Sequence, residues 1–218
     1  MTNQESCRFA ATVTRQVSLP YLLYRPPEYD LRRAWPLVLF LHGRGERGTD
    51  LARVPLHGLP KLIAAGQHFP FVVASPQCPP DSYWPEQLDA LEALLDHLTA
   101  TLKIKTRQVY VTGLSMGGFG TWYLAARCPQ RIAAIAPVCG GGLPWMADRL
   151  KDVPVWAFHG SKDSVVHPRE SRVMVQAVRQ AGGKARLTIY QGVGHDSWTQ
   201  TYANPKLYTW LLRHKRSV

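Results

Sequence analysis

A serine between glycines stands in a context that could make it a nucleophile. Residues 109–112 are β-branched or aromatic and predict a strand, Gly113-Leu114-Ser115-Met116-Gly117 follows as a tight turn, and residues 121–127 predict a helix. A strand, a turn and a helix in this order give Gly-x-Ser-x-Gly the geometry of a nucleophile elbow. The amide-rich start of the helix would face the serine, where negative charge develops during acyl transfer. The alternative is a glycine-rich turn with an incidental serine.

Two later loops supply groups that could activate this serine. A hydroxyl needs a base to remove its proton, and the base needs a third group to orient it. Asp163 ends the loop His159-Gly160-Ser161-Lys162-Asp163, after a predicted strand at 154–158, and His195 follows a predicted strand at 185–190. Loops beyond the carboxyl ends of parallel strands gather at one edge of a sheet. We therefore predict Asp163 as the acid and His195 as the base.

The rival groups fit this chemistry less well. Asp148 and Asp152 precede their strand and suit a solvated surface, Asp196 would point elsewhere on an extended loop, and His159 at a strand end is typical of a structural histidine. No local histidine–carboxylate spacing and no Cys-x-x-Cys pair predicts a metal site. The four cysteines are widely spread in the sequence and are expected to be mostly reduced thiols.

A second glycine-rich loop follows the apolar run 35–41. His42-Gly43-Arg44-Gly45-Glu46-Arg47-Gly48 contains the dinucleotide-binding spelling Gly-x-Gly-x-x-Gly. That fingerprint needs a helix at once and a carboxylate about 20 residues later, and neither is predicted here. We expect no nucleotide and no other cofactor. The loop is either part of the site around Ser115 or a flexible surface loop.

Strands and helices alternate along most of the chain. Strands, most of them apolar, are predicted at 35–41, 71–75, 109–112, 132–138, 154–158 and 185–190, and helices at 60–67, 85–102, 121–127, 169–181 and 205–214. Residues 13–24 predict one or two antiparallel edge strands, split at Pro20. Continuous apolar strands alternating with helices are typical of a mostly parallel sheet flanked by helices. We predict an α/β fold in a single domain that covers residues 1–218.

Composition narrows the possible partners. The net charge is +11, but the basic residues are dispersed, except for a cluster at 213–216, and no nucleic-acid-binding motif accompanies them. We expect no nucleic-acid partner. No apolar run is long enough to span a bilayer, so no membrane insertion is expected. No signal peptide is visible, which predicts a cytoplasmic location.

Four segments resemble the α/β-hydrolases. They are 41–48, 113–122, 159–163 and 194–198. The resemblance extends from residue 36 to about residue 213 and is greatest to small bacterial esterases of the phospholipase/carboxylesterase-like ("predicted peptidase") group. It shades into feruloyl-esterase and polyhydroxyalkanoate-depolymerase-like enzymes. It implies that Ser115 is the nucleophile, Asp163 the acid and His195 the base, and that the backbone N–H groups of Arg44 and Met116 form an oxyanion hole. It also implies a fold without a large lid domain.

These inferences predict a carboxylesterase-type serine hydrolase that works through an acyl-enzyme. Only a loop and a short helix fit between residues 138 and 154, which predicts an open cleft for small-molecule or polymer-attached esters. Trp84, Trp145 and Trp198 lie in loops near the expected site and either bind substrate or pack the loops. A serine peptidase and a non-catalytic binding protein of the same fold are the alternatives. The oligomeric state is left open.

Overall fold

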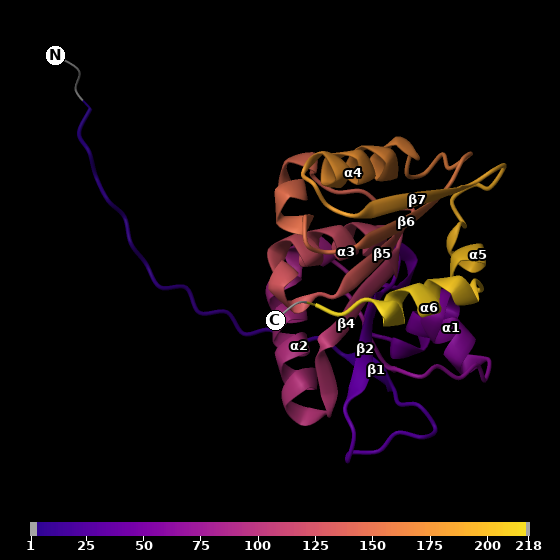
Figure 1. Cartoon of the computed structure of the whole chain (residues 1–218). Helices are drawn as coiled ribbons and strands as arrows, with labels where there is room; N and C mark the ends of the chain where they lie inside the picture. Colours follow the sequence, from indigo (N-terminus) through magenta and orange to yellow (C-terminus); the bar gives the residue numbers. More distant parts are fainter. Residues whose placement is uncertain (1–3, 217–218) are drawn as a thin grey trace.

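A central sheet lies between two layers of helices in the computed structural model, which describes residues 4–216 (Figure 1). The strands are β1 (Tyr21–Tyr24), β2 (Trp35–Leu41), β3 (Val72–Pro76), β4 (Ile104–Leu114), β5 (Ala134–Val138), β6 (Val155–Gly160) and β7 (Ala185–Tyr190). Within the described residues they form one seven-stranded sheet in the order β1-β3-β2-β4-β5-β6-β7. Strand β1 pairs antiparallel with β3, and every other pairing is parallel. The predicted α/β-hydrolase architecture is confirmed.

Strand β2 shows why the sheet must be covered on both faces. All seven of its residues are buried. Leu37, Leu39 and Leu41 belong to one hydrophobic cluster, whereas Val38 and Phe40 belong to a second cluster on the opposite face. Successive side chains of a strand point to opposite faces, so a continuous apolar run requires apolar partners on both sides. This explains the continuous rather than alternating pattern in the sequence.

The two helical layers bury these two faces. The helices are α1 (Gly58–Ala64), α2 (Leu88–Thr101), α3 (Met116–Arg127), α4 (Arg169–Gln180), α5 (Trp198–Tyr202) and α6 (Pro205–Arg213). Short 3₁₀-helices are η1 (Arg44–Glu46), η2 (Leu51–Leu56), η3 (Trp84–Glu86), η4 (Pro129–Arg131) and η5 (Pro144–Leu150). Residues of α2, α3 and α4 pack in the first cluster, and those of α1, α5 and α6 in the second (Figure 1).

Some boundaries differ from the predicted ones. Of the extended stretch predicted at 13–24, only β1 pairs in the sheet, and residues 13–20 form no strand. Helix α3 begins directly after Ser115, five residues earlier than predicted, because its first turn is rich in glycine and carries little helical signal. Helix α5 was not predicted; its five residues are too few for a periodic pattern.

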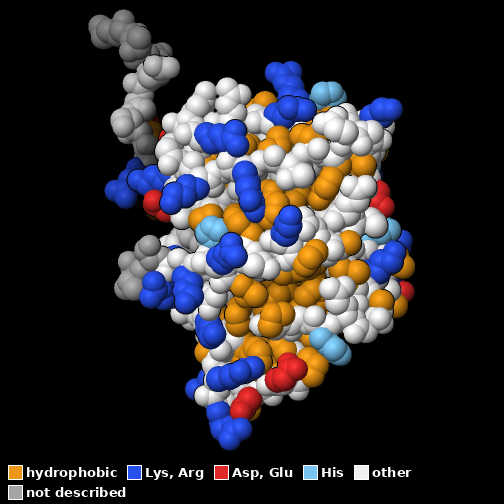
Figure 2. All heavy atoms as spheres, turned by 45° about the vertical axis from the view of Figure 1, so that its right-hand side comes forward, with side chains coloured by type: hydrophobic (Ala, Val, Ile, Leu, Met, Phe, Trp, Pro, Cys, Tyr) orange, Lys and Arg blue, Asp and Glu red, His pale blue; other side chains and the backbone are white. Residues whose placement is uncertain are grey.

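The connection between β5 and β6 holds only a glycine-rich loop and η5, so no large lid domain is present within the described residues. None of the described helices combines the length and apolarity needed to cross a membrane. Lysine and arginine side chains are scattered over the face drawn in Figure 2, between apolar and neutral ones, rather than gathered in one patch. This distribution agrees with the dispersed charge of the sequence.

Candidate active site

Ser115 occupies a strained turn between β4 and α3. Its backbone has φ 53° and ψ −116°, an unusual conformation for a residue that is not glycine. Its N–H donates to the Val138 carbonyl at 2.9 Å, which ties the turn to β5. A Cβ on Gly113 would collide with the backbone of Gly117, and one on Gly117 with the Leu41 carbonyl. The two glycines therefore permit the close approach of backbone segments that holds the serine at the sheet edge.

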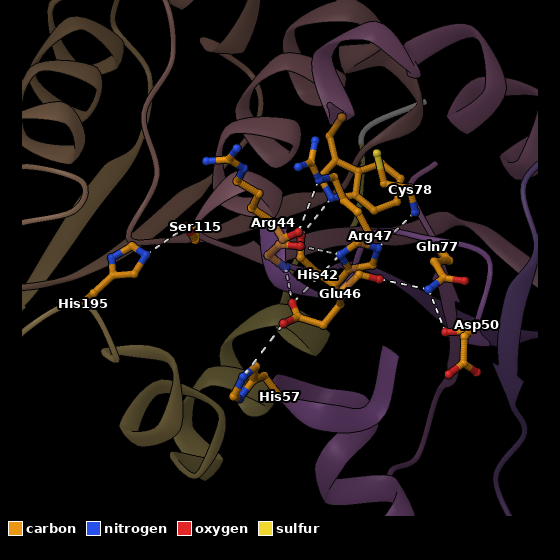
Figure 3. A network of polar contacts seen from close by, with 12 residues as sticks. His42, Arg44, Glu46, Arg47, Asp50, His57, Gln77, Cys78, Ser115 and His195 are labelled. Atoms are coloured by element: carbon orange, nitrogen blue, oxygen red, sulfur yellow. Dashed lines mark hydrogen bonds and ion pairs between the residues drawn. The ribbon is translucent and has the colours of Figure 1, made fainter. Parts of the chain in front are cut away.

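His195 joins Ser115 to Asp163 in a chain of hydrogen bonds. His195 Nε2 lies 2.9 Å from Ser115 Oγ, and His195 Nδ1 lies 2.7 Å from Asp163 Oδ2. In Figure 3 the imidazole, carried by the loop after β7, points at the hydroxyl of Ser115. The three loops follow β4, β6 and β7, and parallel strands bring their carboxyl ends to the same edge. A hydroxyl, an imidazole and a carboxylate in this order can support nucleophilic catalysis.

The carboxylate of Asp163 is buried yet held in its ionised form. The residue is 3 % exposed. Burial by itself raises the pKa of a carboxyl, but hydrogen bonds from His195 and from the amides of Val166 and Val165 outweigh it and lower the pKa of Asp163. The two amides donate to Oδ1 at 2.9 Å each, which leaves Oδ2 for the imidazole.

His159 contacts the same carboxylate, which sequence reasoning missed. Its ring is fully buried, and its Nε2 lies 3.2 Å from Asp163 Oδ2 and 2.8 Å from the Val166 carbonyl. Both neighbours are acceptors, so Nε2 carries the proton. Its Nδ1 is 2.7 Å from the hydroxyl of Ser171. Burial lowers the pKa of His159 and favours the neutral ring. The reading of His159 as a structural histidine left out its contact with Asp163.

The loop after β2 lies beside Ser115. Arg44 is the first residue of η1 and Met116 the first residue of α3, and the first N–H groups of a helix have no acceptor within it. Figure 3 shows Arg44 next to Ser115, at the start of a polar network that also contains Glu46 and His57. Glu46, 5 % exposed, accepts the Gly43 N–H at 2.8 Å and thereby fixes the turn that carries the Arg44 amide. The spacing of Gly43 and Glu46 could have indicated this cap.

The buried side chain of His42 holds the loop after β2 in place. Its Nε2 accepts the Cys78 N–H at 3.0 Å, so the proton is on Nδ1, which lies 2.6 Å from the Gly43 carbonyl. Burial lowers the pKa of His42 to about 4, and the ring is neutral at pH 7. These contacts brace the loop after β2.

The three tryptophans named from the sequence occupy different environments. Trp84 is fully buried and donates its Nε1–H to the His42 carbonyl at 2.9 Å, so the prediction that it contacts substrate is wrong. It packs under the loop after β2 instead. Trp198 is partly buried, with its ring centroid 5.2 Å from that of His195. Trp145, at the start of η5, is 75 % exposed.

Comparison with known proteins places these features in a family. Residues 82–206, more than half of the chain, match the dienelactone hydrolase family. A solved structure of a thermostable esterase superimposes with a TM-score of 0.80 and 36 % identity, over 92 % of this chain and 60 % of that one.

Among curated proteins, feruloyl esterase D of Neurospora crassa is 27 % identical over 179 residues, 73 % of this chain and 59 % of the relative. The bifunctional acetylxylan esterase/xylanase XynS20E of Neocallimastix patriciarum is 30 % identical over 87 residues, 40 % of this chain and 12 % of the relative. The chain thus spans less than two thirds of the length of each of these proteins.

Proposed function

The chain belongs to the dienelactone hydrolase family of the α/β-hydrolase superfamily, and on this premise we propose that it cleaves carboxylic esters through an acyl-enzyme on Ser115. The observation that carries the proposal is the continuous hydrogen-bond chain Ser115 Oγ–His195–Asp163 Oδ2, with distances of 2.9 Å and 2.7 Å. Family membership makes the chain a hydrolase, and the triad and its mechanism are our inference.

In the first half of the reaction, His195 Nε2 accepts the proton of Ser115 as Oγ attacks the ester carbonyl. Asp163 stabilises the imidazolium that forms and keeps Nδ1–H directed at itself. The imidazolium then gives its proton to the departing alcohol, and the acyl group stays on Oγ. In the second half, His195 takes a proton from water as its oxygen attacks the acyl-enzyme, and the imidazolium then returns a proton to Ser115 Oγ as the acid is released.

The backbone N–H groups of Met116 and Arg44 stabilise the oxyanion of both tetrahedral intermediates in this proposal. Each is the first amide of a helix, so each is available to an external acceptor. One such donor contributes about 10²–10³-fold to kcat in serine hydrolases. The bond from Gly43 N–H to Glu46 supports this role because it fixes the peptide next to Arg44.

Small or polymer-attached esters are the substrates that we infer. The connection between β5 and β6 forms no lid domain in the described part of the chain, and the relatives include an acetylxylan esterase/xylanase and a feruloyl esterase. Trp198 beside His195 offers an aromatic face to an acyl or phenolic group. We propose that the chain acts as a single domain. The cytoplasmic location stays a prediction from the sequence, and another curated relative is an uncharacterised protein named as secreted.

Hydrolysis of p-nitrophenyl acetate tests the proposal. Ser115→Ala should lose about 10⁴-fold or more of kcat, since the members of a triad act as a unit. A fluorophosphonate probe should label the wild-type protein and not this variant. Ser18→Ala, at an exposed serine outside the sheet, is the matched control and should keep both activity and labelling. Undiminished turnover by Ser115→Ala would refute the proposal.

Two further measurements separate the alternatives. A serine peptidase would cleave the matched p-nitroanilide as well as the p-nitrophenyl ester, whereas an esterase would cleave the ester and leave the anilide intact. A non-catalytic binding protein would react with neither substrate and would not be labelled by the probe. A panel of esters from acetate to long acyl chains, with feruloyl esters and lactones included, then defines the acyl and alcohol portions.

A further inference from the structure

A buried thiol that the proposed reaction does not use lies at the end of β5. Cys139 follows Val138 directly and has a positive φ of 39°, and its N–H donates to the Phe158 carbonyl at 2.8 Å. Its side chain is fully buried. The thiol is therefore held at the same sheet edge as Ser115, in a backbone conformation that L-residues other than asparagine and aspartate rarely adopt.

This thiol, a carboxylate and an imidazole converge on one point. The Sγ of Cys139, a carboxylate oxygen of Asp163 and a ring nitrogen of His195 all lie within 4.8 Å of one another. The three residues follow β5, β6 and β7, so their approach results from the parallel sheet and not from sequence spacing. Ser197 lies next to the thiol as well. Its hydroxyl is fully buried and has no oxygen or nitrogen partner within hydrogen-bond distance among the described residues.

We propose that Cys139, Asp163 and His195 form a binding site for Zn²⁺ or a similar thiophilic divalent cation, and that occupation of this site inhibits the hydrolase. A thiolate, an imidazole and a carboxylate are a donor set that suits Zn²⁺. The binding claim stands on the geometry of these side chains alone. The claim of inhibition also rests on the proposed function.

The distances are compatible with coordination after a small adjustment. Bonds of about 2.0–2.3 Å from zinc to oxygen, nitrogen and sulfur place tetrahedral ligands about 3.5 Å apart. His195 Nδ1 and Asp163 Oδ2, which lie 2.7 Å apart, therefore need to separate by about 1 Å, and Cys139 Sγ, within 4.8 Å of both groups, needs to approach them by about 1 Å at most. The Ser197 hydroxyl or a water molecule can supply the fourth ligand.

Coordination would disable the base. The nitrogen that faces Asp163 is Nδ1, at 2.7 Å. A cation bound there takes the Nδ1 lone pair, so the single proton of the neutral imidazole moves to Nε2, and the proton of the Cys139 thiol leaves to solvent. The hydrogen bond between His195 and Asp163 is then lost, and Nε2, which lies 2.9 Å from Ser115 Oγ, already carries a proton and cannot accept the one from the hydroxyl.

Direct binding tests the site independently of activity. Titration of the wild-type protein with zinc chloride in a calorimeter should show one site that Cys139→Ser weakens at least tenfold. Co²⁺ should give a sulfur-to-cobalt charge-transfer band with the wild-type protein and none with Cys139→Ser. Cys7→Ser, at an exposed cysteine, and Cys128→Ser, at a buried one in another place, are matched controls that should bind like the wild type. Equal zinc affinity in wild type and Cys139→Ser would overturn the proposal.

Inhibition is measured separately. Zinc should reduce hydrolysis of p-nitrophenyl acetate by the wild type and EDTA should restore it, while Cys139→Ser and Cys139→Ala should need at least tenfold more zinc for the same effect. Should one of these variants fail to fold, as judged by circular dichroism, the other carries the comparison. A protein without esterase activity refutes the proposed function and leaves the calorimetric result to decide on the zinc site. Zinc that binds at Cys139 without inhibiting the wild type refutes the regulatory claim.

Discussion

His159 Nε2 lies 3.2 Å from Asp163 Oδ2, the same carboxylate oxygen that lies 2.7 Å from His195 Nδ1. One oxygen therefore faces two imidazoles, the fully buried ring of His159 and the ring of His195 beside Ser115. The buried ring has no direct contact with Ser115 among the described residues, so its effect on the reaction must pass through Asp163. We regard His159 as a positioning residue.

Replacement of His159 should reveal this role. His159→Leu removes the N–H that faces Asp163, and we expect a kcat about 10- to 100-fold lower with little change in KM, since a small displacement of a catalytic group costs this much. His159→Gln keeps a donor on a side chain of similar reach and should recover part of the loss. Steady-state kinetics and the pH profile of kcat/KM measure the effect. A His159→Leu variant that folds and has the wild-type kcat would contradict the assignment.

Removal of the Glu46 carboxylate should loosen the loop after β2, which carries the Arg44 amide of the proposed oxyanion hole. Glu46→Ala leaves the Gly43 N–H without its acceptor, which costs about 1–3 kcal/mol of the free energy of unfolding. The Arg44 amide is then less well placed, and kcat should fall by about tenfold or more. Glu46→Gln retains an acceptor oxygen, so its stability and its kcat should lie between those of Glu46→Ala and those of the wild type. The control is Glu28→Ala, at an exposed carboxylate. Thermal unfolding and kcat that are unchanged in Glu46→Ala would argue against the role of this cap.

Trp198 and Trp145 could still contact substrate, and their replacement should affect different classes of ester. The Trp198 ring lies 5.2 Å from the His195 ring and 5.5 Å from the His57 ring. Trp198→Ala should lower kcat/KM for aryl esters by about tenfold, because an aromatic contact next to the proposed base His195 is lost. Trp198→Phe keeps an aromatic ring and should retain most of the wild-type kcat/KM. The highly exposed Trp145 is free to contact a large substrate. Trp145→Ala should therefore affect polymer-attached esters more than p-nitrophenyl acetate, and equal effects on both would contradict that contact.

Acid should destabilise the fold through His42. Burial lowers its pKa from the model-peptide value of 6.5 to about 4 in the folded protein. Between these two values the unfolded chain binds a proton that the folded chain does not, so this contribution is complete above pH 6.5 and is lost as the pH falls towards 4. The difference corresponds to about 3 kcal/mol.

Denaturant unfolding between pH 7 and pH 4 measures this effect. The wild type should lose stability over this range, and His42→Gln, although less stable at pH 7, should show a smaller slope. The same slope in both proteins would mean that other groups cause the acid sensitivity. Burial also lowers the pKa of His159, so this residue should likewise make the free energy of unfolding decrease as the pH falls.

The sequence by itself determined the sheet and the loops at its edge. A continuous apolar run predicted β2 with its observed bounds, because a strand buried on both faces needs apolar residues at every position. Gly-x-Ser-x-Gly between a strand and a helix indicated the turn at Ser115, since only glycine permits the close backbone approach there. Parallel pairing then requires Ser115, Asp163 and His195 to lie at the same edge, whatever their distance in the sequence.

Only the tertiary structure decided which buried side chains contact the loops at that edge of the sheet. Trp84 is as aromatic as Trp198 in the sequence, but it is buried under the loop at His42, whereas Trp198 lies beside His195. His159 lies near the end of β6 and Cys139 directly follows β5, and no local motif marks either residue. Their approach to Asp163 depends on the order and register of β5 and β6. Contacts between side chains of different strands are set by that packing, and local sequence patterns do not encode it.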